Sequence, residues 1–322
     1  MTLILGIEST AHTFGIGIAS EDGILVNIND TYTPPQGVGI HPRAAADHHV
    51  MVGPRLLKEA LGKLGIAIRD IDAVAFSMGP GLGPPALRIG ATLARAIAIK
   101  FSKPLVPVHH GVAHVEIARW SVKFRDPLVL LVSGGHTMVI SHSGKSYGVF
   151  GETIDIAVGN ALDYFARRVG LPNPGVPHLE ECAEKGSKYI PLPYTVKGQD
   201  VSFSGLVEEA LRLVRKGITL PDICLSLVET AYSMLGEVVE RGLALTGKRE
   251  LLLAGGVARS RRLKSIMEWI ANEFNAKLGI VPPEYAGDNG GMIALTGLLA
   301  YKSGITIDPT EAVTKQRWRL ER

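Results

Sequence analysis

The chain has 322 residues, of which 46% are hydrophobic, 6% aromatic and 20% charged. This composition can bury a large core and excludes disordered, collagen-like and low-complexity classes. The length exceeds what a single core usually supports, and 37 glycines and 19 prolines supply many turns, so we expect two lobes of comparable size. The net charge of +3 neither requires nor excludes a nucleic-acid partner.

Cysteine content and the N-terminus predict the cellular location. Cys182 and Cys224 lack the Cys-x-x-Cys spacing of a zinc knuckle and lie in stretches with helical patterning, so we expect no disulfide framework and a reducing, cytoplasmic environment. Residues 2–8 carry no basic start and no cleavage site, and no uncharged apolar run reaches membrane-spanning length. We therefore expect neither secretion nor membrane insertion.

The first predicted elements are two strands, at residues 3–7 and 14–18, joined by a polar corner at 8–13. The same pattern of strand, corner and strand returns at residues 128–140, where Ser133-x-x-His136-Thr137 repeats Ser9-x-x-His12-Thr13. We interpret this repeat as an internal duplication of one lobe.

Strands and helices alternate through the rest of the chain. We expect helices at 50–64, 88–99, from 109, at 157–169, 221–245, from 260 and at 290–302, and strands at 73–76, 105–108, 250–253 and 278–281. This alternation predicts an α/β protein with mixed sheets covered by helices. The expected lobe boundary lies near Asp126, so lobe I spans 1–125, with the C-terminal segment 303–322 returning to it, and lobe II spans 126–302.

The sharpest local signal is His110-Gly-Val-Ala-His114 at the start of a predicted helix. Residues four apart share a helix face, so both imidazoles can reach one cation. Asp288 precedes a helix in a glycine-rich loop and is the candidate oxygen ligand, and two histidines with one carboxylate suit Fe(II) or Zn(II). The alternative is a structural or surface histidine pair. Gly111 stands where a His-Glu-x-x-His peptidase needs its general base, which argues against a metallopeptidase.

Three glycine-rich loops, at 79–85, 133–137 and 254–258, each follow an apolar strand, where backbone N–H groups could bind an anion. For any one loop taken alone, a plain turn is the favoured interpretation, but three such loops at strand ends together favour a ligand-binding role. The dinucleotide fingerprint is matched only superficially at Gly81-x-Gly83-x-x-Ala86, because the ribose-binding acid is missing. The sequence has no P-loop motif and no Gly-x-Ser-x-Gly elbow, which excludes Walker-type ATPases and the nucleophile-elbow hydrolases.

Basic residues gather in three parts of the chain. Residues 73–115 contain no acid, and further clusters lie at 259–264 and 315–319. These clusters are either solvated helix faces or a surface that meets a polyanion.

Together these motifs resemble the TsaD/OSGEP family, and the match runs nearly from end to end. The motifs that carry the resemblance are Gly6-Ile-Glu-Ser-Thr10, Leu87-Arg-Ile-Gly90, His110-x-x-x-His114, Ser133-Gly-Gly-His-Thr137, Gly151-Glu-Thr-Ile-Asp155, Ser202-Phe-Ser-Gly-Leu206, Ala254-Gly-Gly-Val-Ala258 and Asp288-Asn-Gly-Gly-Met292. The short length and the C-terminal Gln316-Arg-Trp-Arg319 are similar to the archaeal and eukaryotic branch, the catalytic subunit of the KEOPS complex.

The resemblance implies a two-lobe actin/Hsp70-like (ASKHA) fold with duplicated mixed-sheet domains and a central nucleotide cleft. It also implies transfer of the threonylcarbamoyl group from threonylcarbamoyl-AMP to adenosine 37 of tRNAs that read ANN codons, which forms t6A. One divalent metal, Fe(II) or Zn(II), on His110, His114 and Asp288 would polarise the carbamoyl carbonyl, so no Ser or Cys nucleophile is needed. The implied partners are tRNA, a KEOPS kinase subunit and small accessory subunits, and the implied cleft ligand is ATP, AMP or threonylcarbamoyl-adenylate.

The resemblance also assigns ligand-binding residues. It places a phosphate corner at Glu8, Ser9 and Thr10. It places adenylate-binding positions at Leu131, Val132, Ser133, Gly134, Gly135, Asp163, Val176, Glu180, Gly255, Gly256 and Ser260. Three of these positions depart from the family pattern. Leu131 stands where many archaeal relatives have Tyr, Val176 stands where the family has Gly, and Ser260 stands where it has Asn.

Three other functions stay open alongside the transferase. One is an O-carbamoyltransferase or a nucleotide-dependent kinase of the same fold, although a kinase normally carries Asp where this chain has Glu8. A second is a noncatalytic nucleotide-binding scaffold, in which the basic clusters only dock partners. The third is the metallopeptidase against which Gly111 argues.

Overall fold

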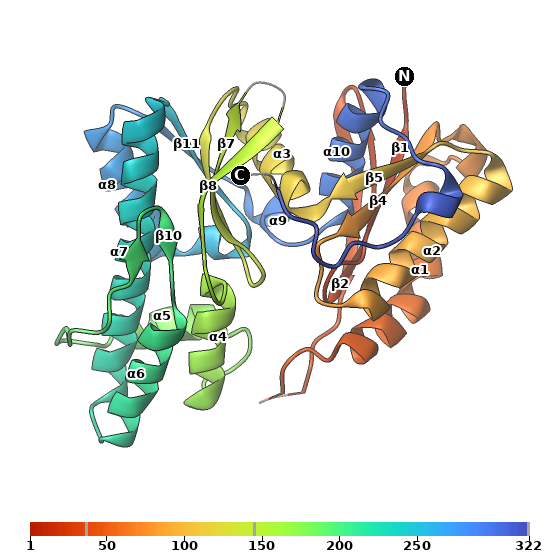
Figure 1. The fold of residues 1–322 in the computed structure, drawn as a ribbon. Helices are drawn as coiled ribbons and strands as arrows, with labels where there is room; N and C mark the ends of the chain where they lie inside the picture. Colours follow the sequence, from red (N-terminus) through yellow and green to blue (C-terminus); the bar gives the residue numbers. More distant parts are fainter. Residues whose placement is uncertain (36–37, 144–145, 321–322) are drawn as a thin grey trace. The chain divides into compact units, whose positions relative to one another are not determined.

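The computed structural model describes residues 1–35, 38–143 and 146–320. The chain separates into two compact units, Met1–Ile117 with Gly287–Arg319, and Ala118–Ala286 with Leu320. Each unit carries one five-stranded mixed sheet (Figure 1). Within the described ranges, the search for a helix both long and apolar enough to span a bilayer finds none.

The sheet of the first unit has the order β3-β2-β1-β4-β5. Strands β1, β2 and β3 form an antiparallel meander, whereas β4 lies parallel to β1 and β5 parallel to β4. Its strands are β1 (Ile4–Glu8), β2 (Thr13–Ser20), β3 (Gly23–Thr31), β4 (Ala73–Gly79) and β5 (Leu105–His109). Its helices are α1 (Pro42–Leu64), η1 (Ile68–Asp70), α2 (Pro84–Phe101), the start of α3 (His110–Val122), α10 (Gly290–Lys302) and η3 (Pro309–Glu311).

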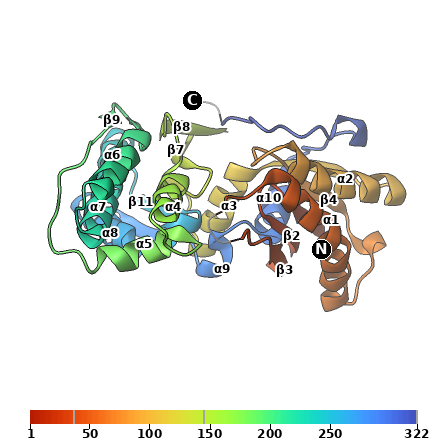
Figure 2. The same ribbon diagram turned by 90° about the horizontal axis from the view of Figure 1, so that it is seen from below.

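The sheet of the second unit has the order β12-β11-β6-β7-β8. Its strands are β6 (Leu128–Val132), β7 (Thr137–Ser143), β8 (Ser146–Glu152), β11 (Glu250–Ala254) and β12 (Lys277–Ile280), with a separate hairpin of β9 (Val196–Lys197) and β10 (Asp200–Val201). Its helices are α4 (Val158–Arg168), α5 (Gly175–Ala183), α6 (Ser204–Arg215), α7 (Leu220–Thr246), η2 (Gly256–Arg259), α8 (Arg261–Glu273) and α9 (Pro283–Ala286) (Figure 2).

The predicted duplication is confirmed by the strand connections. In the second unit β6, β7 and β8 form the antiparallel meander, and β11 and β12 continue the sheet in parallel, as β4 and β5 do in the first. The corner between β6 and β7 is therefore the counterpart of the corner between β1 and β2. Mixed sheets covered by helices confirm the predicted α/β class.

Both expected lobe boundaries, at residues 126 and 303, lie further along the chain than the boundaries between the two compact units. The first unit ends at Ile117, inside α3, and the chain returns to it at Gly287 rather than at residue 303. Helix α10 belongs to the first unit because its first turn is tied to β3. The side-chain oxygens of Asn29 and Asn27 accept from the backbone N–H of Gly290 (3.2 Å) and Gly291 (3.0 Å). Residues 321–322 of the expected C-terminal segment lie outside the described residues.

The cysteine expectation is wrong, because Cys182 of α5 and Cys224 of α7 form a disulfide. The two residues are 42 positions apart in sequence, and their Cα atoms lie 5.9 Å apart because α5 packs against α7. Two helical cysteines carry no local signal of this packing. The disulfide also removes the cysteine argument for a reducing compartment.

Candidate functional site

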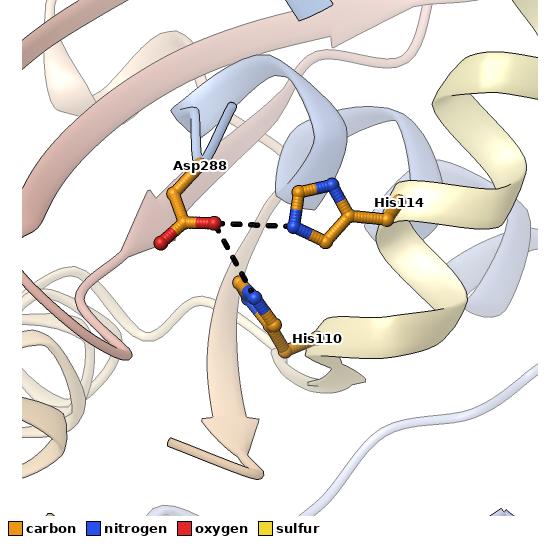
Figure 3. A group of neighbouring side chains, drawn as sticks. All are labelled: His110, His114 and Asp288. Atoms are coloured by element: carbon orange, nitrogen blue, oxygen red, sulfur yellow. Dashed lines mark hydrogen bonds and ion pairs between the residues drawn. The ribbon is translucent and has the colours of Figure 1, made fainter. Parts of the chain in front are cut away.

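The three predicted metal ligands converge in the first unit. Helix α3 begins directly after β5, so His110 and His114 lie one turn apart beside the carboxyl end of that strand. Asp288 comes from the loop that leads into α10, whose first turn is capped by the Asn289 side chain. The Oδ1 atom of Asp288 lies 3.1 Å from Nε2 of His114 and 3.5 Å from Nε2 of His110 (Figure 3).

The donor set fits a divalent transition metal. One ligand atom from each of His110, His114 and Asp288 lies within 4.8 Å of the others. Both histidines are buried, with exposed fractions of 5% and 1%, so the site is shielded from bulk water. Two imidazoles and one carboxylate, with coordination positions left for substrate, are the ligands that Fe(II) and Zn(II) accept.

Glu8, which the resemblance places in a phosphate corner, lies against the other side of the His110 ring. Its Oε2 is 3.2 Å from Nδ1 of His110, and its Oε1 accepts from the backbone N–H of Thr10 at 2.6 Å. A buried carboxylate on Nδ1 orients a ligating imidazole and leaves Nε2 for the metal. The backbone N–H of Ser9 donates to Ser77 Oγ at 3.1 Å, so neither the Ser9 nor the Thr10 amide is free for a phosphate.

The ionisation of the cluster follows from its charges. Burial opposes the charged imidazolium of His110, but the carboxylates of Glu8 and Asp288 outweigh that cost and raise the pKa of His110 to about 9. Burial would likewise raise the pKa of Asp288, but the adjacent His110 and His114 hold it well below its usual range. In the metal-free protein, His110 is therefore protonated at neutral pH, and its positive charge balances the carboxylates of Glu8 and Asp288.

The second unit brings two of the predicted adenylate-binding loops together. The side chains of Leu131 and Val132 are fully buried in β6, so only their backbone could reach a ligand. Gly255 has a positive φ of 88°, and a Cβ there would lie 2.4 Å from the carbonyl oxygen of Val132, which keeps loop 254–256 against the end of β6. Gly256 follows at the start of η2.

The tip of the first of these loops is a closed turn. Ser133 Oγ accepts from the backbone N–H groups of Gly135 (3.2 Å) and His136 (3.0 Å). Gly134 and Gly135 are exposed at the tip. The hydroxyl of Ser133 therefore holds the loop in shape, and the exposed glycines are the part that a ligand could approach.

The remaining predicted residues gather around Tyr232 of α7, which is fully buried. Its hydroxyl donates to Oε1 of Glu180 on α5 at 2.6 Å and also interacts with Ser260, the N-cap of α8. Burial, followed by the charge of Glu180, raises the pKa of Tyr232 well above its usual value, so the hydroxyl stays a donor. Asp163 of α4 contributes to the same surroundings.

Val176 departs from the family's glycine without strain. Helix α5 starts at Gly175, inside the proline-rich bend, so Val176 has helical backbone angles that any residue adopts. Its backbone N–H donates to Oδ1 of Asp163 at 3.0 Å. The bend thereby ties α5 to α4.

Tyr232 and the supporting role of Glu8 were missed from sequence. Tyr232 lies within a largely apolar helix, 52 residues from Glu180, and nothing local distinguishes it from a core aromatic. Asp155, part of a motif that carried the resemblance, caps α6 by accepting from the Ser204 backbone at 3.0 Å and from the Ser202 hydroxyl at 2.6 Å. The candidate metal ligands and the predicted corner at residues 8–10 thus lie in the first unit, and the residues predicted to bind the adenylate lie in the second.

Comparison with known sequences gives one family. A family model described as TsaD, tRNA N6-adenosine threonylcarbamoyltransferase, matches residues 23–295. The tRNA N6-adenosine threonylcarbamoyltransferase of Caldivirga maquilingensis is 65% identical over 319 residues, which are 99% of this chain and 96% of that protein. The protein of the same name from Pyrobaculum neutrophilum is 57% identical over 319 residues, 99% of this chain and 95% of that protein.

Comparison with solved structures gives the fold. HypF from T. kodakarensis matches with a TM-score of 0.68 at 16% identity, over 94% of this chain and 48% of that one. The activator of 2-hydroxyisocaproyl-CoA dehydratase from Clostridium difficile matches with a TM-score of 0.53 at 14% identity, over 94% of this chain and 97% of that one. At these identities the likeness concerns the fold alone, and it confirms the predicted two-lobe actin/Hsp70-like (ASKHA) class.

Proposed function

Because the chain belongs to the TsaD family of tRNA N6-adenosine threonylcarbamoyltransferases, we propose that it is an acyltransferase that forms t6A. It transfers the threonylcarbamoyl group from threonylcarbamoyl-AMP to N6 of adenosine 37 in tRNAs that read ANN codons. The observation that carries the proposal is the convergence of His110, His114 and Asp288 on one point, in a chain that matches these enzymes over 99% of its length.

The reaction is an acyl transfer without a protein nucleophile. The N6 amine attacks the carbamoyl carbonyl carbon, the bond from that carbon to the phosphate oxygen of AMP breaks, and the amine loses a proton. A divalent ion, Fe(II) or Zn(II), would supply Lewis-acid polarisation of the carbonyl. His110, His114 and Asp288 would hold that ion, and Glu8 keeps the His110 ring oriented through Nδ1.

The second unit binds the adenylate in this proposal. The exposed tip at Gly134 and Gly135 and the loop at Gly255 and Gly256 contact the nucleotide. Carboxylates near Tyr232, those of Asp163 and Glu180, accept hydrogen bonds from ribose hydroxyls, and Ser260 lies at the adenine end. The Tyr232 hydroxyl orients Glu180 for that task.

Partners and location follow from the same reaction. The family acts on tRNA, and we assign this chain the same substrate class. We also propose assembly with a KEOPS kinase subunit and small accessory subunits, and a cytoplasmic location. The corner at residues 8–10 argues against the kinase alternative. A kinase would need backbone N–H groups there to bind phosphate, but those of Ser9 and Thr10 already donate to Ser77 and Glu8.

A t6A assay tests the proposal. Metal-loaded protein is combined with its partners, an ANN-decoding tRNA transcript and threonylcarbamoyl-AMP made in place from threonine, bicarbonate and ATP. Wild type is compared with His110→Ala and with His142→Ala, which removes an exposed histidine of β7. We expect product from wild type and His142→Ala and none from His110→Ala. Product from all three removes the metal centre from the mechanism, and product from none refutes the transferase.

A further inference from the structure

The C-terminal residues 305–319, called the strap here, run back over the first unit (dark blue in Figures 1 and 2). The strap covers the open edge of the sheet at its start, because the Ile307 N–H donates to the carbonyl of Leu105 on edge strand β5 at 2.9 Å. Ala312 is buried in the core of the unit and Trp318 packs against that core. The strap is therefore packed against the first unit as part of its fold.

The strap next crosses the carboxyl end of β4. The backbone N–H of Lys315 donates to the carbonyl of Met78 at 2.7 Å. Gly79 has a φ of 149°, and a Cβ on it would lie only 1.9 Å from the Lys315 carbonyl oxygen, so this approach requires glycine. The Lys315 ammonium lies 5.0 Å from the centre of the Trp318 ring, a cation–π contact that joins the two ends of this turn.

The strap ends on His109, the residue directly before the first metal ligand. Nε2 of His109 donates to the carbonyl of Trp318 at 3.0 Å, and the two rings lie 5.0 Å apart at a steep angle. Nδ1 of His109 accepts from the backbone N–H of Val112 at 3.3 Å, which is the N-cap bond of α3. One neutral imidazole makes both bonds, so a single side chain joins the strap to the first turn of α3.

This first turn carries the metal site. His110 is its first residue, and His114 follows one turn later on the same face. A small rotation of the turn would move both Nε2 atoms away from Asp288. We propose that Trp318 of the strap, acting through His109, is a positioning residue for the histidine pair, so that the C-terminus supports the metal centre. The inference rests on the metal centre of the proposed function.

Three variants separate the role of the strap from that of the helix cap. His109→Asn keeps a short side-chain acceptor for the Val112 N–H but cannot reach Trp318. Trp318→Ala removes the ring that holds the strap in place, and Trp318→Phe keeps an aromatic ring. Trp269→Ala is the matched control, because Trp269 is 60% exposed on α8 of the second unit.

The measurement is the affinity of the metal-free full chain for Co(II) alone, by calorimetry and by the visible absorption of bound Co(II). Groups that hydrogen-bond directly to ligating histidines typically contribute 10–100-fold in affinity. His109 acts one step further out, through the first turn of α3, so we expect His109→Asn and Trp318→Ala each to show a loss at the lower end of that range, about tenfold. The double variant should bind no more weakly than either single one, because each substitution breaks the same link between the strap and α3. His109→Asn removes the donor to the Trp318 carbonyl, and Trp318→Ala removes the ring that holds this carbonyl against His109. Trp318→Phe and Trp269→Ala should bind as wild type does.

Three results overturn the inference. Unchanged Co(II) affinity in both single variants, even with a lower melting temperature, makes the strap a stabiliser of the fold only. Additive losses in the double variant show that the two residues act separately. A wild-type chain that binds no Co(II) removes the metal centre itself, which distinguishes failure of the proposed function from failure of the strap.

Discussion

Loss of the disulfide between Cys182 and Cys224 should lower the stability of the second unit substantially. The bond closes a loop between residues 42 positions apart, and the chain-entropy relation assigns a loop of that length about 4 kcal/mol of unfolding free energy. We choose the double variant Cys182→Ala/Cys224→Ala because alanine, unlike serine, adds no buried hydroxyl that would lack a hydrogen-bond partner. This variant should lose about 4 kcal/mol of unfolding free energy. Reduction of the wild-type protein should cause the same loss.

The same change should weaken nucleotide binding. Cys182 lies two residues after Glu180 on α5, and Cys224 lies about two helical turns before Tyr232 on α7. The disulfide therefore fastens the two helices that make the bond from Tyr232 to Glu180. Without it, α5 can shift against α7, and the proposed ribose contact loses its preorganisation.

Urea unfolding at neutral pH tests the stability claim, with oxidised wild type, reduced wild type and the alanine pair measured side by side. Calorimetric titration with AMP on the same samples tests the binding claim. Reaction of the unfolded protein with a thiol reagent gives the redox state directly. Two free thiols in unreduced protein, or equal midpoints for oxidised wild type and the alanine pair, would refute the reasoning.

Three further predictions concern single side chains. The folded pKa of His110, about 9, exceeds its ordinary 6.5, so its ion pairs stabilise metal-free protein fully below pH 6.5. This stabilisation is lost as pH rises through 9, and melting curves at pH 6 and 10 should show the fall in wild type but not in His110→Asn. Asp155→Ala removes the cap of α6 and should cost about 1–2 kcal/mol in urea unfolding; an unchanged midpoint contradicts the capping role. Tyr232→Phe should retain the fold by circular dichroism yet bind AMP more weakly, and equal affinity would separate Tyr232 from the ribose contact.

Local patterns account for most of what could be predicted. Alternating strands and helices indicate an α/β protein, and the repeated corner at Ser9 and Ser133 indicates the duplication, because both are short-range signals. Helix starts were predicted less well. Helix α2 begins at Pro84 rather than Arg88, because prolines suit a first turn that needs no N–H donors. Spacing alone places His110 and His114 on one face of a helix.

Sequence by itself therefore determined the class, the duplicated corners and the histidine pair, since each depends on residues close together in the chain. The sequence also offers Asp288 as a candidate ligand, and the tertiary structure places it against the pair. Tertiary structure alone decided that Glu8 supports His110 and that Tyr232 meets Glu180. It also decided the disulfide and the return of α10 to the first unit. These contacts join residues tens to hundreds of positions apart, and only the packing of helices on the two sheets brings them together.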